Sequence, residues 1–126
     1  MLYRSLTDLD PRSSGCAAIL SEARARNRAL SLTGRLHLED GRFYQWLEGP
    51  AEAVDLVRAK IARDSRHREM AVLQTGLQSE RQFQGWEMGF GVSDPGTLFG
   101  WIADQGISVS DSADFARGVS AFLRAA

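Results

Sequence analysis

Apolar and polar positions alternate with period two along several short stretches of the chain, which is the pattern of half-buried strands. Leu32, Leu36 and Leu38 alternate with polar residues up to about Glu39. A second stretch with strand character, 43–49, begins just after Asp40-Gly41, a dipeptide typical of a two-residue turn. The two stretches together predict a β-hairpin.

Apolar residues recur at helical spacing in two other stretches. The first follows Ser13 or Ser14, either of which can cap a helix, and runs to about residue 29. The second begins at Pro50, where proline suits a first helical turn, and carries one apolar face formed by Ala53, Val54, Val57 and Ile61. Both stretches predict amphipathic helices that cover a sheet.

The predicted elements define a fold class when they are taken in chain order. They are a strand at 1–5, a helix to about 29, strands at 32–39 and 43–49, a helix at 50–64, and strands at 70–77 and 86–90. This β-α-β-β-α-β-β order predicts an α+β ferredoxin-like sandwich, with two helices on one face of a sheet and one extra strand.

The pattern changes to helical after Gly91. Two further helices are predicted at 98–102 and 111–123, and the second carries an apolar stripe formed by Phe115, Val119 and Phe122. Such a stripe must be buried, and the free face of the sheet is the expected place because it carries Tyr44 and Trp46. We therefore expect a core domain at 1–92 and a C-terminal helical extension at 93–126.

Composition describes an ordinary globular chain of 126 residues, 44% apolar and 25% charged, with a formal net charge of −1. This charge gives no electrostatic case for nucleic acid, and no apolar run has the length of a membrane span. Cys16 is the only cysteine, so an internal disulfide is impossible and a reducing cytoplasm fits. His37 and His67 have no Cys or His at ligand spacing, so no metal site is expected.

One polar residue stands out in the second strand of the hairpin. Phe43, Gln45 and Leu47 share one face of that strand, so burial of this face places an amide with four hydrogen-bonding sites in an apolar layer. A neighbouring backbone group or a water would satisfy it. A polar heterocycle held against the sheet would satisfy it as well, and the strand pattern leaves these alternatives open.

A set of short motifs favours the heterocycle. In chain order they are Tyr3-Arg4-Ser5, Asn27, Leu32-Thr33-Gly34, 43–50, Ile61-Ala62-Arg63-Asp64 with Arg66-His67, and 83–90. In this order and at these spacings the chain, from about Leu2 to Phe90, resembles the BLUF domain, the bacterial blue-light sensor that uses flavin. The resemblance implies a cofactor, FAD or else FMN or riboflavin, and a photosensory function.

The resemblance also implies roles for individual residues. Tyr3 matches the tyrosine that gives an electron and a proton to the excited flavin, and Gln45 matches the glutamine that rearranges after light. Asn27 matches the asparagine that hydrogen-bonds the ring edge, while Trp86 and Met88 match a pair on the last strand that is linked to signal output. Four further positions match residues lining the cofactor: Ser5, Phe43, Arg66 and His67. Switching the glutamine changes the hydrogen bonds at the flavin edge and shifts the absorption to longer wavelength.

Each of these residues also has a purely structural interpretation. Tyr3 suits a core position, Asn27 suits a helix C-cap, and His67 suits a solvated loop. Trp86 and Met88 share one face of the predicted last strand and suit a plain core. Near Asn27 the chain departs from the family pattern, because Arg26 stands where many members have a small polar residue, and its guanidinium could reach the cofactor's phosphates or a ring carbonyl.

Two other function classes fit a small α+β domain: a cofactor-free oxygenase or isomerase, and a flavin-binding regulatory module that does not respond to light. The pairing of Tyr3 with Gln45 on adjacent strands favours the photoreceptor, because neither alternative requires it. The resemblance implies a short, stand-alone type without a catalytic domain, which signals to a separate protein and forms a homodimer or larger assembly. We expect Trp46 and the 115–122 stripe to form the contact layer.

Overall fold

Residues 1–125 are described by the computed structural model, and their elements follow the expected order. The elements are β1 (Leu2–Leu6), α1 (Ser14–Leu30), β2 (Thr33–Glu39), β3 (Arg42–Glu48), α2 (Ala51–Arg63), β4 (Arg68–Gln74), β5 (Gly89–Val92), α3 (Thr97–Asp104) and α4 (Ser112–Ala125). The ferredoxin-like prediction is confirmed, with the two extra helices at the C-terminal end.

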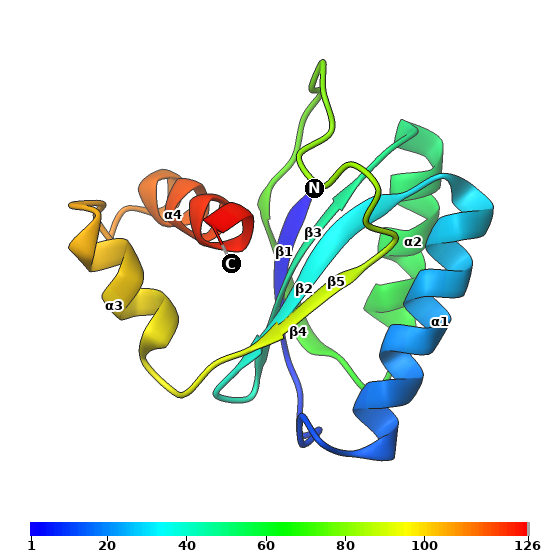
Figure 1. Ribbon diagram of the computed structural model, residues 1–126, viewed down its shortest axis with the longest axis horizontal. Helices are drawn as coiled ribbons and strands as arrows, with labels where there is room; N and C mark the ends of the chain where they lie inside the picture. The colour runs from blue at the N-terminus through cyan, green and yellow to red at the C-terminus, as the bar shows by residue number, and fades with distance from the viewer. Residues whose placement is uncertain (126) are drawn as a thin grey trace.

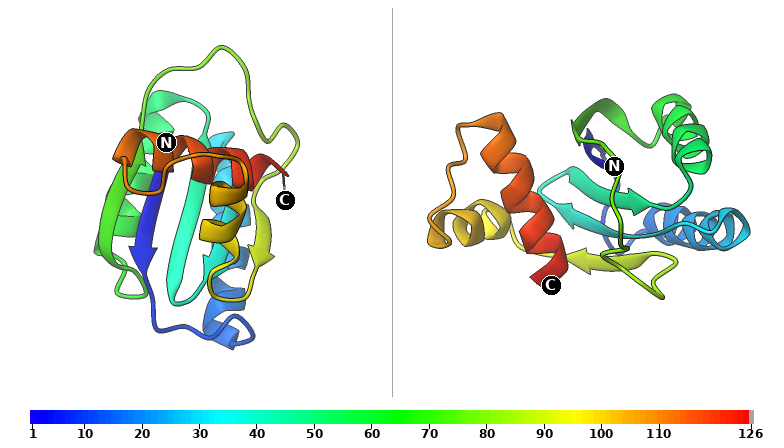
Figure 2. Two further views of the ribbon diagram at one scale, coloured as in Figure 1. Left: turned by 90° about the vertical axis from the view of Figure 1, so that its left-hand side faces the viewer. Right: turned by 90° about the horizontal axis from the view of Figure 1, so that it is seen from above.

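The strands form one sheet in the order β4-β1-β3-β2-β5. Strand β3 lies at its centre, antiparallel to both β1 and β2, and β5 pairs in parallel with β2. Helices α1 and α2 cover one face, and α3 and α4 lie on the other (Figures 1 and 2). The central strand is therefore buried on both faces.

Local sequence determines where several elements begin and end. The Ser13 hydroxyl accepts a hydrogen bond from the Cys16 N–H at 3.1 Å and so caps α1, as predicted. The helix ends at Ser31, whose φ of 58° is left-handed and whose N–H bonds to the Asn27 carbonyl. Ser31, and not Asn27, is thus the C-cap. Asp40 has a φ of 50°, as the predicted hairpin turn requires.

Each face of the sheet has its own apolar core. Tyr3, Phe43 and Leu47 are fully buried under α1 and α2. Trp46 and the α4 stripe form the other core, in which Val119 is fully buried. The C-terminal helices therefore pack on the free sheet face, as predicted. The expectation that Trp46 and the stripe form a contact between subunits is wrong for Trp46, Val119 and Phe122, which are buried within one chain, while Phe115 is only half-buried.

The last strand begins later than the sequence predicts, at Gly89 instead of residue 86. Gly85 has a φ of +82°, and the Phe83 carbonyl accepts the Trp86 N–H at 3.0 Å, so a tight turn occupies this stretch. Trp86 and Met88 consequently precede β5 and do not share a strand face. Met88 is buried, whereas Trp86 is 43% exposed.

Candidate functional site

Two facing residues on adjacent strands lie at the centre of the site. Tyr3 of β1 is in register with Gln45 of β3, and its hydroxyl donates a hydrogen bond to the amide oxygen Oε1. Both side chains are buried. Burial raises the pKa of the Tyr3 phenol well above its ordinary value of 10. The phenol is therefore neutral, and its proton is held in a bond to an uncharged acceptor.

The other end of the Gln45 amide faces Met88. Its Nε2 donates to the thioether sulfur Sδ at 3.6 Å. Neither end of the amide is bonded to the backbone, so side chains on β1 and on the segment before β5 hold the amide in its orientation. An amide that bonds two different groups through its two ends can exchange them by rotation.

Asn27 connects α1 to the same segment before β5. It is fully buried, and its Nδ2 donates to the Glu87 carbonyl at 2.6 Å. Its Oδ1 accepts from Nε and Nη2 of Arg26, both at 3.2 Å. Burial lowers the pKa of the half-buried Arg26 guanidinium. A cation and an amide are therefore paired on the inner side of α1.

His67 lies beside the phenol ring of Tyr3. Its Nδ1 lies 2.7 Å from the Ser5 hydroxyl, and its ring lies 5.0 Å from the Phe43 ring and 6.3 Å from that of Tyr3. Burial lowers the pKa of His67, although the nearby Asp64 opposes this effect. His67 is thus a half-buried, neutral hydrogen-bonding group at pH 7 and not a solvated loop residue.

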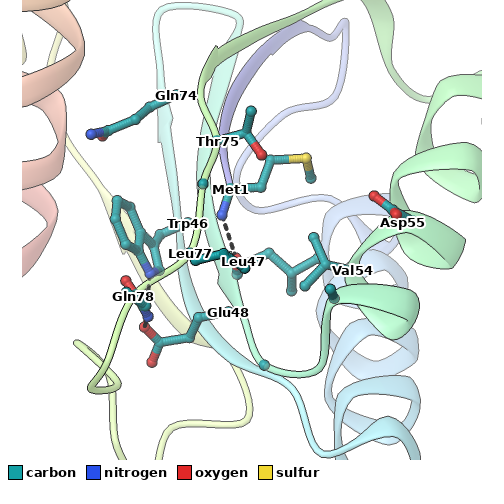
Figure 3. A pocket seen from close by; sticks show the side chains of 13 residues that line it. Met1, Trp46, Leu47, Glu48, Val54, Asp55, Gln74, Thr75, Leu77 and Gln78 are labelled. Atoms are coloured by element: carbon teal, nitrogen blue, oxygen red, sulfur yellow. Dashed lines mark hydrogen bonds between the residues drawn. The ribbon is translucent and has the colours of Figure 1, made fainter.

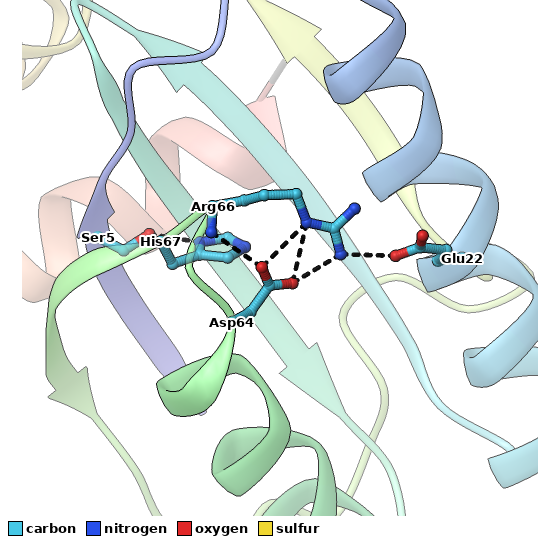
Figure 4. A network of polar contacts seen from close by, with 5 residues as sticks. All are labelled: Ser5, Glu22, Asp64, Arg66 and His67. Carbon is cyan, nitrogen blue, oxygen red and sulfur yellow. Dashed lines mark hydrogen bonds and ion pairs between the residues drawn. The ribbon is translucent and has the colours of Figure 1, made fainter.

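An ion-pair network joins α1 to the loop after α2 (Figure 4). Arg66 bonds to Asp64 and, through Nη2 at 2.6 Å, to Glu22 of α1. Hydrogen bonds to both carboxylates raise the pKa of Arg66, and the bond from Arg66 lowers that of Asp64. Sequence analysis assigned no role to Asp64, which lies in a quoted motif, and missed Glu22, because only the fold brings Glu22 to Arg66.

Tyr3, Gln45 and His67, together with the charged groups of this network, line a small cavity of about 30 Å³ between the sheet, α1 and α2. Four other site residues do not line it: Ser5, Asn27, Phe43 and Met88. Its lining comprises Tyr3, Ile19, Glu22, Ala23, Arg26, Leu36, Gln45, Ile61, Asp64, Arg66 and His67. Apolar walls with a few convergent polar groups are typical of a site for a heterocyclic cofactor. The residues fit a flavin, whose ring edge carries both donors and acceptors. A flavin ring is larger than this cavity. It would enter by displacing the side chains of Arg26 and Arg66, which are partly exposed.

A second hollow, of about 390 Å³, lies near the other end of β3 (Figure 3). None of the site residues described above lines it. Its buried carboxylate, Glu48, accepts five hydrogen bonds from Trp46, Gln78, Gln82, Thr33 and Phe83. This carboxylate ties the 78–83 segment to the sheet, a structural role that sequence analysis did not assign.

Residues 1–125 contain no cluster of three side chains able to hold a metal ion. Within the same range, every helix is too short or too polar to cross a bilayer. A ferredoxin-like sheet with a polar, partly aromatic pocket under two helices offers a candidate site for an organic cofactor.

The chain belongs to the BLUF family, described as sensors of blue light using FAD, whose pattern it matches over residues 1–89. It is 37% identical over 67 residues to the photoactivated adenylate cyclase subunit beta of Euglena longa, covering 53% of this chain and 8% of that one. It is 31% identical over 83 residues to the blue light- and temperature-regulated antirepressor BluF of Escherichia coli (strain K12), covering 66% and 21%. The chain thus spans only a small part of these relatives.

Two solved structures are similar over nearly the whole chain. The photo-activated state of BlsA has a TM-score of 0.79 at 25% identity and covers 98% of this chain and 90% of its own. The dark state of BlrB, a BLUF protein, has a TM-score of 0.72 at 30% identity and covers 97% and 94%. The C-terminal helices therefore lie within the aligned region.

Proposed function

We propose that this protein is a blue-light photoreceptor that binds FAD between α1, α2 and the sheet. Membership of a family that uses FAD supports the cofactor. The observation that carries the photochemical assignment is the buried bond from Tyr3 to Gln45, at the wall of the cavity. The same pocket chemistry would accept FMN or riboflavin, and one BlrP1 structure from Klebsiella pneumoniae is described with FMN.

The remaining groups hold the cofactor. Asn27 and His67 offer neutral donors and acceptors to the ring edge, and Phe43 supplies an apolar surface. Ser5 orients His67 through their 2.7 Å contact. Arg66, and next to it Arg26, supply positive charge at the mouth of the cavity, where a carbonyl oxygen or a phosphate would be neutralised.

A bound flavin supplies the absorption of blue light and an acceptor for one electron. Tyr3 is the donor, because phenols are oxidised more readily than the other side chains lining the cavity. Its neutral phenol keeps its proton in the dark, and the bond to Gln45 Oε1 gives that proton a path when the electron leaves. Tyr3 and Gln45 therefore act as one unit.

Rearrangement of the Gln45 amide would store the signal. In the structure Oε1 faces Tyr3 and Nε2 faces Met88, and we assign this arrangement to the dark state. Exchanging the two ends removes the N–H donor from the sulfur, whereas converting the amide to its tautomer moves one proton from Nε2 to Oε1. Either change alters the groups presented to the ring. The change then reaches Met88 and, beyond it, Trp86 on the surface.

For output, we propose that the chain forms a homodimer or larger assembly in the cytoplasm and passes its signal to a separate protein, without a catalytic reaction of its own. The contact between subunits would use surfaces outside the buried Trp46 layer. The core at 1–92 would sense light, and the extension at 93–126, whose helices α3 and α4 pack on the sheet, would respond.

The absorption spectrum of the purified protein, recorded in darkness and directly after blue light, tests this function. We expect a flavin spectrum that shifts reversibly to longer wavelength. A yellow protein without a shift would indicate a light-inert flavin module. A protein that stays colourless after reconstitution with FAD would contradict the proposal and favour a cofactor-free enzyme.

A further inference from the structure

Arg35 of β2 is a buried cation without an anionic partner. It lies on the sheet face opposite the cofactor cavity and is only 9% exposed. Its Nε has no hydrogen-bond partner, and it forms no ion pair with any residue in 1–125. Burying a charge without a counter-charge is costly. Such a residue suggests that the counter-charge comes from another molecule.

The neighbouring strand is shaped around this side chain. A Cβ atom on Gly91 would lie 2.6 Å from Nη2 of Arg35, and one on Gly89 would lie 2.6 Å from the Trp86 ring. The two glycines of β5 therefore leave room for the guanidinium and the indole. The Arg35 guanidinium carbon lies 5.6 Å from the centre of that ring, a cation–π distance.

The Arg35 side chain lines a shallow pocket of about 360 Å³, together with Arg24, Gly85, Trp86, Glu87, Met88 and Gly89. Glu87, the pocket's carboxylate, is already paired with Arg28 through both oxygens at 2.9 Å. Arg24 uses its Nε to bond the Met88 carbonyl at 3.1 Å. The pocket thus holds two arginines, Arg24 and Arg35, and a single carboxylate that is already hydrogen-bonded to a third arginine.

The pocket shares a residue with the cofactor site. Met88 lines it and also accepts the hydrogen bond from Gln45. Asn27 bonds to the Glu87 carbonyl in the same segment. A change in the Gln45 amide therefore acts directly on a wall of this pocket.

We propose that this pocket, named here the Arg35 pocket, binds an aspartate or glutamate side chain of a partner protein. A guanidinium fork matches one carboxylate, and the half-exposed Trp86 supplies the aromatic contact common in interface centres. Nucleic acid would need a wider basic surface, which a chain of net charge −1 with two arginines here does not offer. Light would alter the affinity of the pocket for this carboxylate through Met88. This coupling rests on the proposed function, whereas the carboxylate site does not.

Titration of the flavin-loaded chain with a hexaglutamate peptide at low salt tests the Arg35 pocket. The NMR signal of the Trp86 indole reports the binding. We expect Arg35→Gln to raise the dissociation constant about tenfold, and Arg35→Lys, which keeps the charge but loses the guanidinium fork, to restore only part of the affinity. Arg58→Gln, on the exposed surface of α2, is the matched control and should bind like the parent.

Equal affinity of the parent and Arg35→Gln would overturn the carboxylate site, and so would preference for an oligothymidylate over hexaglutamate. The titration is repeated under blue light, with the absorption spectrum recorded on the same sample. A shifted spectrum with unchanged affinity would overturn the coupling through Met88. An unshifted spectrum would contradict the photoreceptor function, while the dark comparison of parent and variant still decides the pocket.

Discussion

Gln45 and Met88 meet on the helix-covered face of the sheet, where the amide Nε2 donates to the thioether Sδ at 3.6 Å. One residue earlier in the chain, the Glu87 carbonyl accepts from Asn27. Two amides, one from β3 and one from α1, thus hold the segment that leads into β5. Rotation of the Gln45 amide would remove one of these two attachments.

Replacing the thioether tests this attachment. Met88→Leu conserves volume, so we expect the stability to change by less than about 1.5 kcal/mol. The dark arrangement loses its N–H···S contact, and return to it after light should slow about two- to fivefold, the effect of about 0.5–1 kcal/mol on a rate. Time-resolved absorption measures this rate. Met70→Leu, on β4, is the control; an equal effect there would contradict the assignment.

Removing the phenolic hydroxyl tests the photochemical pair. Tyr3→Phe should bind flavin but show no light-induced shift, because the proton donor to Gln45 is absent. The amide oxygen is left unpaired, and we expect a loss of about 1–2 kcal/mol in the free energy of unfolding. Absorption spectra and urea titration measure the two effects. Tyr44→Phe, on the opposite face of the sheet, should keep the shift, and a full shift in Tyr3→Phe would reject the mechanism.

Much of the fold follows from local patterns. The alternation around Gln45 assigns its neighbours to the correct faces, because side-chain direction along a strand depends only on position. The cap at Ser13 and the turn at Asp40-Gly41 also follow from local chemistry. The start of β5 does not, since Trp86 and Met88 are typical strand residues and only the turn at Gly85 excludes them from the strand.

The site was predictable only through resemblance to a family. Residue types alone place Gln45 in a buried layer, but its partners come from segments 42 and 43 residues away. Charge patterns likewise cannot distinguish the buried Arg35 from a surface arginine. Glu48 shows the same limit, because three of its five donors lie in a segment of irregular structure that has no periodic pattern.

Close packing of the C-terminal helices gives a test of the extension. A Cβ on Gly118 of α4 would lie 2.8 Å from Ile102 Cγ2 of α3, so Gly118→Ala should destabilise the protein by about 1–3 kcal/mol. Gly100 has open space around its Cα, and Gly100→Ala should stabilise the helix by about 0.5–1 kcal/mol. Urea unfolding compares the variants. Similar effects of both substitutions would show that α3 and α4 do not pack as described.

The Glu48 carboxylate provides a pH-dependent prediction. Burial opposes its charge, but the bonds from Gln82, Phe83, Trp46 and Thr33 outweigh burial, so its pKa is lowered from 4.5. A lowered pKa in the folded state stabilises the fold above pH 4.5, and this contribution is lost as the pH falls through the folded-state value. Glu48→Gln cannot accept all five bonds and should lose about 2–3 kcal/mol at pH 7. In urea titrations, the difference in the free energy of unfolding between Glu48→Gln and the parent should narrow below pH 4.5. Glu80→Gln, exposed in the same loop, is the control and should match the parent throughout. A difference for Glu48→Gln that is independent of pH would contradict an ionised Glu48.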